Sequence, residues 1–172
     1  LRVQKIVNGI VTDYTLHGKN VVHMTKGNDE LHFFYDAQNR PAVVVYNNVP
    51  YAYVKNLQGD IVALLNGAGN VVVSYAYDAW GMPIGKSGSM AETLGTLNPF
   101  RYRGYVFDEE TGLYYLRSRY YHASISRFLC IDRWLGGTSD GILSHNPLCY
   151  CKNSPVMKQM LTGNFWQPFA QQ

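Results

Sequence analysis

Short apolar stretches alternate with turn-forming residues through roughly the first half of the chain. The clearest apolar stretches are Pro41 to Tyr46, Ile61 to Leu65 and Val71 to Tyr77. Turn residues follow or separate these stretches, at Gln38-Asn39-Arg40, Gln58-Gly59-Asp60, Gly67-Ala68-Gly69-Asn70 and Trp80-Gly81. Strands of this length separated by Gly, Asn or Asp turns predict serial antiparallel β-hairpins.

The segment from Val71 to Asp78 gives the clearest strand signal. β-branched residues come first, and Tyr75 and Tyr77 then alternate with other residues. This alternation predicts that both rings lie on one face of the strand. Such hairpins lack a core of their own, so each needs neighbours to stack upon. The edges of a short array invite pairing with another chain.

Aromatic–Asp pairs, each followed by a turn, mark a loose repeat. The pairs are Tyr35-Asp36 and Tyr77-Asp78, with a variant at Phe107-Asp108. We expect the ring to end a strand and the carboxylate to accept backbone N–H groups of the turn, as in an Asx turn. Arg40 is placed to pair with the first carboxylate or to stack on a ring.

A second pattern, the core run, extends from Asn98 to Tyr121 and is dense in Tyr and Phe rings. An acidic turn interrupts it at Glu110-Thr111-Gly112. No helical period fits this run, and it favours strands that stack rings on one face. We expect four arginines to fasten the tyrosines through cation–π and acidic-turn contacts, a role that suits Arg better than Lys: Arg101, Arg103, Arg117 and Arg119.

Two segments depart from the strand pattern. Ser89-Met90-Ala91-Glu92 has capping-box spacing, which predicts a short helix near residues 90–95 that Gly95 ends. Residues 144–152 are compatible with a second short helix, because Pro155 follows. The fold class predicted is therefore all-β, or mostly β, with one or two short helices. Three parts are expected: hairpin repeats over 1–97, the core motif over 98–135 and a variable tail over 136–172.

Composition supports β structure and narrows the partners. The 172 residues include 14 Tyr and 16 Gly, which suit strands and turns. A net charge of +3 is too small to indicate nucleic acid without a concentrated patch. No apolar run is long enough for a membrane helix. The first residues show neither a signal-peptide layout nor an initiator Met, as expected of a piece of a longer protein.

The repeats and the core run together resemble the Rhs, or YD-repeat, family. Phe34-Tyr35-Asp36 and Tyr75-Ala76-Tyr77-Asp78 are similar to YD repeats. The core run, followed by Arg127-Phe128-Leu129, resembles the Rhs-associated core motif in more than twenty positions without a gap. The matching core positions are Arg101, Tyr102, Arg103, Gly104, Tyr105, Asp108, Gly112, Tyr114, Tyr115, Arg117, Arg119, Tyr120, Tyr121, Arg127 and Phe128. The matching repeat-turn positions are Tyr35, Asp36, Tyr77, Asp78 and Gly81.

This resemblance implies a structural role. In the family, YD repeats wind a β-ribbon into a hollow shell, the core motif closes the shell, and a variable C-terminal domain, often a toxin, lies inside. The resemblance therefore implies a shell-closing module that is not an enzyme and has no cofactor. Its partners would be the rest of the shell and a C-terminal toxin or cargo. We also expect that the chain can associate with itself through its sheet edges. Neither a nucleic-acid partner nor a membrane span is expected. The resemblance also implies a bacterial protein that is secreted or delivered to a cell surface and serves in competition between cells.

Many bacterial members of that family carry two Asp-Pro boxes whose carboxylates together release the toxin by self-cleavage. Here Asp132 begins the first box, but Arg133 replaces its Pro, and Met160 stands where the second Asp would be. A thioether cannot transfer a proton, so aspartyl self-cleavage is not expected. Asp132 and Asp140 are the remaining carboxylate candidates. Two fragments divided between about residues 155 and 165 in a denaturing mass measurement would contradict this expectation.

The other chemistry-bearing residues are expected to be structural. His145, Cys149 and Cys151 lie close together, but a one-residue gap between cysteines and the lack of a fourth ligand argue against zinc. Buried thiols are the preferred interpretation, and no metal is expected. Cys130 is expected to be inert through burial in the core motif. Three histidines of the first repeats are expected to be exposed strand residues: His17, His23 and His32.

Two alternatives to a shell module stay open. Exposed rings on a sheet can stack on sugars, which makes a carbohydrate-binding or adhesion module the first alternative. Trp80 and Tyr51 would be its candidates, although packing against turns suits both better. Autoproteolytic processing of the C-terminal region is the second. A glycan array tests the first alternative, and the mass measurement tests the second.

Overall fold

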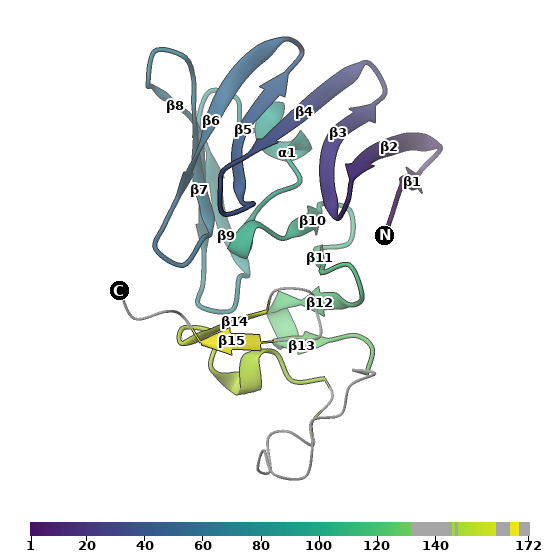
Figure 1. Cartoon of the computed structure of the whole chain (residues 1–172), viewed down its shortest axis with the longest axis vertical. Helices are drawn as coiled ribbons and strands as arrows, with labels where there is room; N and C mark the ends of the chain where they lie inside the picture. The colour runs from purple at the N-terminus through teal and green to yellow at the C-terminus, as the bar shows by residue number, and fades with distance from the viewer. Residues whose placement is uncertain (132–145, 147, 161–165, 169–172) are drawn as a thin grey trace.

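The computed structural model describes residues 1–131, 146, 148–160 and 166–168. Almost all of its regular structure is β, which confirms the predicted fold class. Nine strands form one antiparallel sheet in sequence order, the repeat sheet (Figure 1). Its strands are β1 (Gln4–Val7), β2 (Ile10–His17), β3 (Asn20–Lys26), β4 (Asp29–Tyr35), β5 (Pro41–Tyr46), β6 (Val49–Lys55), β7 (Ile61–Leu65), β8 (Val71–Tyr77) and β9 (Pro83–Ser87).

One face of the repeat sheet carries the main core because apolar residues recur with the two-residue period of a strand. Leu31, Val44, Leu64 and Val73 are fully buried there, and aromatic rings complete the cluster. The rings of Tyr75 and Tyr77 lie on the same face with centroids 6.5 Å apart, as the alternation predicted. The opposite face bears polar and exposed side chains.

Four of the described hairpin turns share one geometry. In each, a carboxylate or amide Oδ1 accepts the backbone N–H groups two and four residues further on. These acceptors belong to Asp36, Asn56, Asn66 and Asp78. The residue three positions after the acceptor has a positive φ in every case: Asn39, Gly59, Gly69 and Gly81. The Asx-type contact expected at Asp36 and Asp78 is thus present, and two asparagines repeat it.

The core run and the residues after it form a smaller antiparallel sheet, the core sheet. Its strands are β10 (Val106–Asp108), β11 (Leu113–Tyr115), β12 (Tyr120–His122) and β13 (Arg127–Phe128). Figure 1 shows this sheet at one end of the repeat sheet, with β14 (Lys158–Met160) and β15 (Trp166–Pro168) next to it. Short 3₁₀ turns occur at Tyr102–Gly104, Ala123–Ile125 and Cys151–Asn153. The second core cluster lies under the core sheet.

Helix α1 (Leu94–Leu97) overlaps the predicted helix at 90–95 but begins later, and Gly95 lies inside it. Residues 89–93 form turns instead. A Cβ on Gly95 would lie 3.1 Å from a Val73 methyl and 3.1 Å from the Met90 carbonyl oxygen. Gly95 therefore allows close packing on β8 and does not end the helix.

The second predicted helix, at 144–152, lies only partly within the described residues. Residues 144, 145 and 147 are outside them. Cys149 forms an isolated bridge with Arg127, and the only helical turn described nearby is the 3₁₀ turn that begins at Cys151. Backbone pairing with β13 thus takes the place of helical bonds here. None of the helices in the described ranges has the length and apolarity that a membrane span requires.

Candidate functional site: a cationic cavity between the repeat sheet and the core run

The core run is attached to the repeat sheet by buried arginines. Arg101 is 3% exposed, and its guanidinium carbon lies 4.2 Å from the centroid of the Tyr75 ring. Its Nη2 donates to Glu109 Oε1 at 2.8 Å and to the Gly95 carbonyl at 2.5 Å, and Nη1 donates to the Asn98 carbonyl. One side chain thus joins β8, α1 and the acidic turn, and its charge is compensated by Glu109.

Arg103 makes a second attachment, to the hairpin turn between β6 and β7. Its backbone N–H donates to Asp60 Oδ1 at 3.0 Å, and its Nη1 donates to the Gln58 carbonyl at 2.9 Å. Nη2 reaches the Pro155 carbonyl at 2.7 Å. The guanidinium lies 4.8 Å from the Tyr102 centroid. Arg103 therefore holds the turn, the core run and the segment after the core sheet together.

Three tyrosine hydroxyls form what we call the tyrosine clamp, on the last turn of the repeat sheet. Tyr102 donates to the Ala79 carbonyl at 2.9 Å, Tyr121 to the Trp80 carbonyl at 2.7 Å, and Tyr114 to the Gly81 carbonyl at 2.7 Å. The carbonyls are those of three successive residues. Burial raises the pKa of each phenol, so the hydroxyls keep their protons as donors.

The other two core arginines differ from each other. Arg119 is buried, with its guanidinium 3.5 Å from the Phe128 centroid. Arg117 has a φ of 63° in the turn before β12, and its side chain lines a cavity. In the described part of the chain, Arg117 makes no cation–π or acidic-turn contact, so the expectation that it fastens a tyrosine is wrong. The left-handed backbone turns its side chain toward the cavity.

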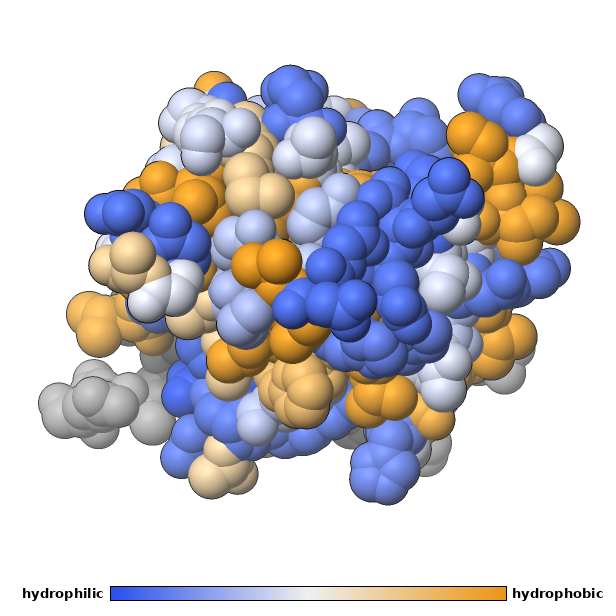
Figure 2. All heavy atoms as spheres, turned by 90° about the horizontal axis from the view of Figure 1, so that it is seen from above, coloured by the Kyte–Doolittle hydropathy of each residue, from blue (hydrophilic) through white to orange (hydrophobic). Residues whose placement is uncertain are grey.

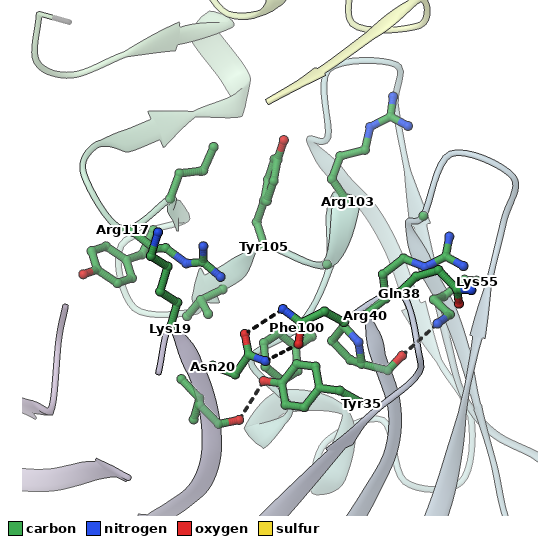
Figure 3. Close-up of a pocket in the computed structure, with 18 of the residues that line it drawn as sticks. Lys19, Asn20, Tyr35, Gln38, Arg40, Lys55, Phe100, Arg103, Tyr105 and Arg117 are labelled. Atoms are coloured by element: carbon green, nitrogen blue, oxygen red, sulfur yellow. Dashed lines mark hydrogen bonds between the residues drawn. The ribbon is translucent and has the colours of Figure 1, made fainter. Parts of the chain in front are cut away.

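That cavity, of about 760 Å³, lies between the repeat sheet and the core run. Figure 3 shows Lys19 and Arg117 on one side of it and Arg40 and Lys55 on the other. Six cationic residues line it in all: Arg2, Lys19, Arg40, Lys55, Arg103 and Arg117. Its described lining residues include no Asp, Glu, His, Cys or Ser. The remaining lining is mainly tyrosine, amide and apolar side chains.

Most of these cations have a carboxylate partner outside the cavity lining. Arg2 donates to Asp108 at 2.7 Å, and Lys55 donates to Asp36 at 2.8 Å. Burial acts to lower the pKa of Arg2, but the hydrogen bond to Asp108 and the electrostatic interactions with Tyr14, Asp108 and Tyr120 together outweigh burial, and the pKa is raised. Lys19 and Arg117 have no carboxylate partner among the described residues. Their charges are available to an added anion.

The phenols in the cavity act as donors as well. Tyr35 lies in the lining and donates to the Val21 carbonyl at 2.7 Å. Its pKa is raised by burial, a shift that the charge of Arg117 opposes in part. Because the Tyr35 proton is already used in this bond, the attraction for a carboxylate or phosphate group comes from the cations, above all from Lys19 and Arg117. The cavity is thus suited to binding an anionic group.

Most of the residues that the sequence singled out for self-cleavage or metal binding are not among the described residues. Asp132, Arg133, Asp140 and His145 lie outside the described residues, so the prediction of no self-cleavage stays a prediction. Met160 ends β14.

Two of the three cysteines match the expected burial. Cys149 and Cys151 are buried, and burial raises the pKa of the Cys151 thiol to about 12. Cys130 is exposed, so its expected burial is wrong, because it follows β13 at the edge of the core sheet. No disulfide joins any of them.

The aromatic candidates for sugar binding are not free platforms. Tyr51 is 8% exposed within the main core. Trp80 is half-buried and packs against the second core cluster. Among the histidines, His23 and His32 come together across β3 and β4, with ring centroids 4.3 Å apart. Sequence analysis missed that pair because it compared helix spacings only.

The chain is similar in sequence to parts of several bacterial proteins. The chain is 38% identical over 160 residues to the tRNA3(Ser)-specific nuclease WapA of Bacillus spizizenii, covering 91% of this chain and 7% of that protein. It is 39% identical over 160 residues to the tRNA nuclease WapA of Bacillus subtilis, with the same coverage. It is 39% identical over 66 residues to the toxin protein Tse5 of Pseudomonas aeruginosa, covering 38% of this chain and 5% of that protein. No protein-family model matches the chain.

Solved structures show the same fold. The Photorhabdus luminescens Tc holotoxin pore with mutated TccC3 matches with a TM-score of 0.67 at 20% identity, covering 98% of this chain and 8% of that chain. The crystal structure of TcdB2-TccC3 matches with a TM-score of 0.65 at 21% identity, covering 93% and 8%. This chain therefore spans less than a tenth of the length of the WapA, Tse5 and TccC3 chains described above.

The relatives correct one expectation. Three of the curated relatives are named as tRNA nucleases. This finding contradicts the expectation that the chain is not an enzyme, which was drawn from the implied shell role and from the incomplete pair of Asp-Pro boxes. The chain is similar, over most of its length, to a part of the WapA tRNA nucleases, and it shares its fold with a part of Tc toxin chains.

Proposed function

We propose that this chain is the part of an Rhs-type toxin in which a β-repeat shell ends and is closed around a C-terminal toxin. The cationic cavity would hold an anionic segment of that toxin. The whole protein would act as a nuclease on tRNA, as its WapA relatives are named, and would be secreted or delivered to a cell surface. The shell, its cargo and the activity of the whole protein are all parts of this proposal.

The tyrosine clamp is the observation that carries the proposal. Nine strands follow one another without a crossover. Leu94 and Phe100, from the segment that follows β9, then pack in the main core cluster. Three buried hydroxyls bond the returning core run to the last repeat turn. Such a contact holds the core run against the last hairpin of the array, which is the arrangement expected where a series of repeats gives way to a closing segment.

The opposite edge of the sheet supports a continuing shell. Among the described residues β1 pairs only with β2, so its outer backbone groups are unpaired. Leu1, Val3, Ile6 and Ile10 are each more than half exposed there. Figure 2 shows hydrophobic side chains at the margin of the molecule over this hairpin, beside a hydrophilic surface. We assign this edge to the preceding strand of the repeat shell, since the matched relatives are many times longer.

Limited proteolysis of the whole protein tests shell closure. Changing Tyr114→Phe and Tyr121→Phe together removes two clamp bonds and keeps both rings. We expect the segment that follows the core motif to be cut faster in this variant than in the wild type. Tyr120→Phe is the matched control, because the Tyr120 hydroxyl has no hydrogen-bond partner among the described residues. Equal protection of the segment in all three proteins would overturn the closing role.

The nuclease part of the proposal is tested separately. Purified whole protein is incubated with total tRNA, and the products are resolved by length. We expect cleavage of tRNA by the wild type and by the clamp variant, because the clamp lies in the shell. Intact tRNA after prolonged incubation with both would refute the nuclease activity while leaving the closure test unaffected.

Direct contact with RNA is a second candidate function for the cavity. Six cationic residues line the cavity and no carboxylate does, which favours phosphate binding. The similarity of the chain to tRNA nucleases is the reason to consider RNA as the source of the phosphates. Lys19→Glu with Arg117→Glu reverses the two charges that lack a carboxylate partner. We expect this variant to bind labelled tRNA at least about tenfold more weakly at low salt, in anisotropy titrations of the chain.

A matched charge reversal on the same sheet controls for net charge. Lys26 lies at the end of β3 and Lys86 lies in β9, and neither lines the cavity. Lys26→Glu combined with Lys86→Glu therefore makes the same change of four charge units away from the cavity. Equal loss of tRNA binding in both double variants would assign the effect to overall charge and would end the case for RNA in the cavity.

A further inference from the structure

A cluster of metal-ligand side chains lies on the outer face of the β3–β4 hairpin, away from the cavity. The rings of His23 and His32 are stacked with an interplanar angle of 15°. Glu30 Oε1 lies 2.9 Å from His23 Nε2 and 3.2 Å from His32 Nε2. One carboxylate oxygen thus faces both imidazoles, and the candidate ligand atoms all lie within 4.8 Å of one another.

Backbone pairing holds these three residues in place. His23 is directly opposite His32, and Thr25 is directly opposite Glu30. Paired residues of antiparallel strands point to the same face, and so do residues two apart on one strand. Met24 and Leu31, the intervening pair, point inward and are 3% and 0% exposed. Because Met24 and Leu31 are held in the main core, the side chains of His23, Glu30 and His32 are held on the opposite face of the hairpin.

The hairpin turn determines this register. Lys26 pairs with Asp29, which leaves a two-residue loop of Gly27 and Asn28. Gly27 has a φ of +61°, which suits the first position of a tight hairpin loop. A loop one residue longer would shift the pairing and separate His23 from His32.

The ligand set is selective by its chemistry. Imidazole nitrogens suit Zn²⁺, Cu²⁺, Ni²⁺ and Co²⁺, whereas Ca²⁺ and Mg²⁺ prefer oxygen ligands only. Two histidines and one carboxylate match a three-ligand zinc site with an open fourth position. In a tetrahedral site with Zn–N bonds of about 2.0–2.1 Å, neighbouring ligand atoms are about 3.3 Å apart. The two N–O separations, 2.9 Å to His23 and 3.2 Å to His32, are close to that spacing.

The surroundings leave room for the ion and for its remaining ligand. The side chains of His23, Glu30 and His32 are 26%, 48% and 44% exposed, so each has space to turn by the small amount that binding requires. The carboxylate would offset part of the charge of the ion. Solvent reaches the fourth position from the open face of the sheet.

We propose that His23, Glu30 and His32 form a Zn²⁺ site that links β3 to β4, with water as the fourth ligand. The ion binds the folded hairpin and not the unfolded chain, because only the folded register brings the three residues together. Binding therefore raises the unfolding temperature by linkage. The site is independent of the cavity and of the proposed function.

Isothermal titration of the full chain with Zn²⁺ tests the site, in a Cys130→Ser background that removes the exposed thiol. We expect one Zn²⁺ per chain and a higher unfolding temperature with Zn²⁺ than with EDTA. His23→Gln and His32→Gln are each expected to weaken the site by about 100-fold or more, since even an outer-shell partner is worth 10–100-fold. Co²⁺ substitution should give visible bands of tetrahedral intensity without thiolate charge-transfer absorption.

His17→Gln is the matched control, because His17 is an exposed histidine on the adjacent strand and lies outside the cluster. It should bind Zn²⁺ like the parent chain. Circular dichroism in EDTA establishes that all variants fold alike. Unchanged affinity in both His23→Gln and His32→Gln, or no saturable Zn²⁺ binding by the parent chain, would overturn the proposal.

Discussion

Turns 66–70 and 78–82 of the repeat sheet have the same local structure and different surroundings. In both, a side-chain Oδ1 accepts two backbone N–H groups, and a glycine follows with a φ of +82° or +87°. A Cβ on Gly69 would meet nothing within 4 Å, whereas a Cβ on Gly81 would lie 2.5 Å from the Tyr102 ring. The same hydrogen-bond pattern thus occurs in a turn that contacts nothing at its glycine and in a turn on which the tyrosine clamp packs.

The largest expected effect comes from adding one methyl group to each of these glycines. Gly69→Ala costs the left-handed backbone energy alone, about 1–2 kcal/mol. Gly81→Ala adds overpacking against Tyr102, for a total of about 2–5 kcal/mol. Urea denaturation of the two variants measures the difference. If Gly69→Ala and Gly81→Ala lose the same free energy of unfolding, Tyr102 does not pack tightly against the turn at Gly81.

The next largest loss of stability is expected at an arginine of the core run. Arg103 is almost fully buried and bonds to two carbonyls, so Arg103→Lys should cost about 2–3 kcal/mol. Arg117 lines the cavity, and Arg117→Lys should change the free energy of unfolding by less than about 0.5 kcal/mol. Thermal denaturation in one buffer compares them. A stable Arg103→Lys protein would refute the fastening role of that guanidinium.

Single hydroxyls of the clamp should matter less again. Tyr114→Phe leaves the buried Gly81 carbonyl without its partner and should cost about 1–2 kcal/mol. Tyr120→Phe, from the neighbouring strand, should have almost no effect. Both free energies are read from the same urea titrations. If the two variants have the same free energy of unfolding, the clamp stabilises the fold by packing and the Tyr114 hydrogen bond adds little.

The smallest effect is a pH dependence that distinguishes turn 36–40 from turn 66–70. Burial acts to raise the pKa of Asp36, but the hydrogen bonds from Lys55 and from the Arg40 backbone outweigh it and the pKa is lowered from 3.8. The ionised carboxylate therefore stabilises the fold above the ordinary pKa of Asp, and this contribution is lost as the pH falls through the lowered value. Turn 66–70 has no titratable group.

Asp36→Asn keeps the Oδ1 acceptor of the turn and removes the charge. We expect it to be slightly less stable than the wild type at neutral pH and to match it at low pH. Unfolding temperatures at a series of pH values check this. A constant gap between the two proteins across the series would show that the charge of Asp36 contributes nothing.

The sequence predicted the hairpins well because their determinants are local. Gly, Asn and Asp residues recur at positions where the backbone needs a positive φ or an Asx contact, and apolar residues alternate between them. Asn56 and Asn66 were missed as turn acceptors because the search was for aromatic–Asp pairs. An amide Oδ1 accepts the same bonds as a carboxylate Oδ1. The signal in the sequence was therefore an Asp or Asn five residues before the first residue of the next strand.

The sites were harder to predict because they join segments far apart in the chain. The cavity is lined by residues as far apart in the sequence as Arg2 and Arg117. The net charge of +3, counted over the whole sequence, does not show that these cations gather in one place. The His23–His32 pair depends on a two-residue loop, which the pairing of Lys26 with Asp29 establishes. Had the register been derived from Gly27-Asn28, the pair would have followed.

The amino-acid sequence by itself determined the strands, their turns and the β class, because these depend on neighbours within a few residues. The tertiary structure decided which turn receives the tyrosine clamp and which arginines are buried. It also decided where six like charges surround one cavity. The physical reason is that burial and charge compensation depend on distances in space, which a linear pattern of residues does not contain.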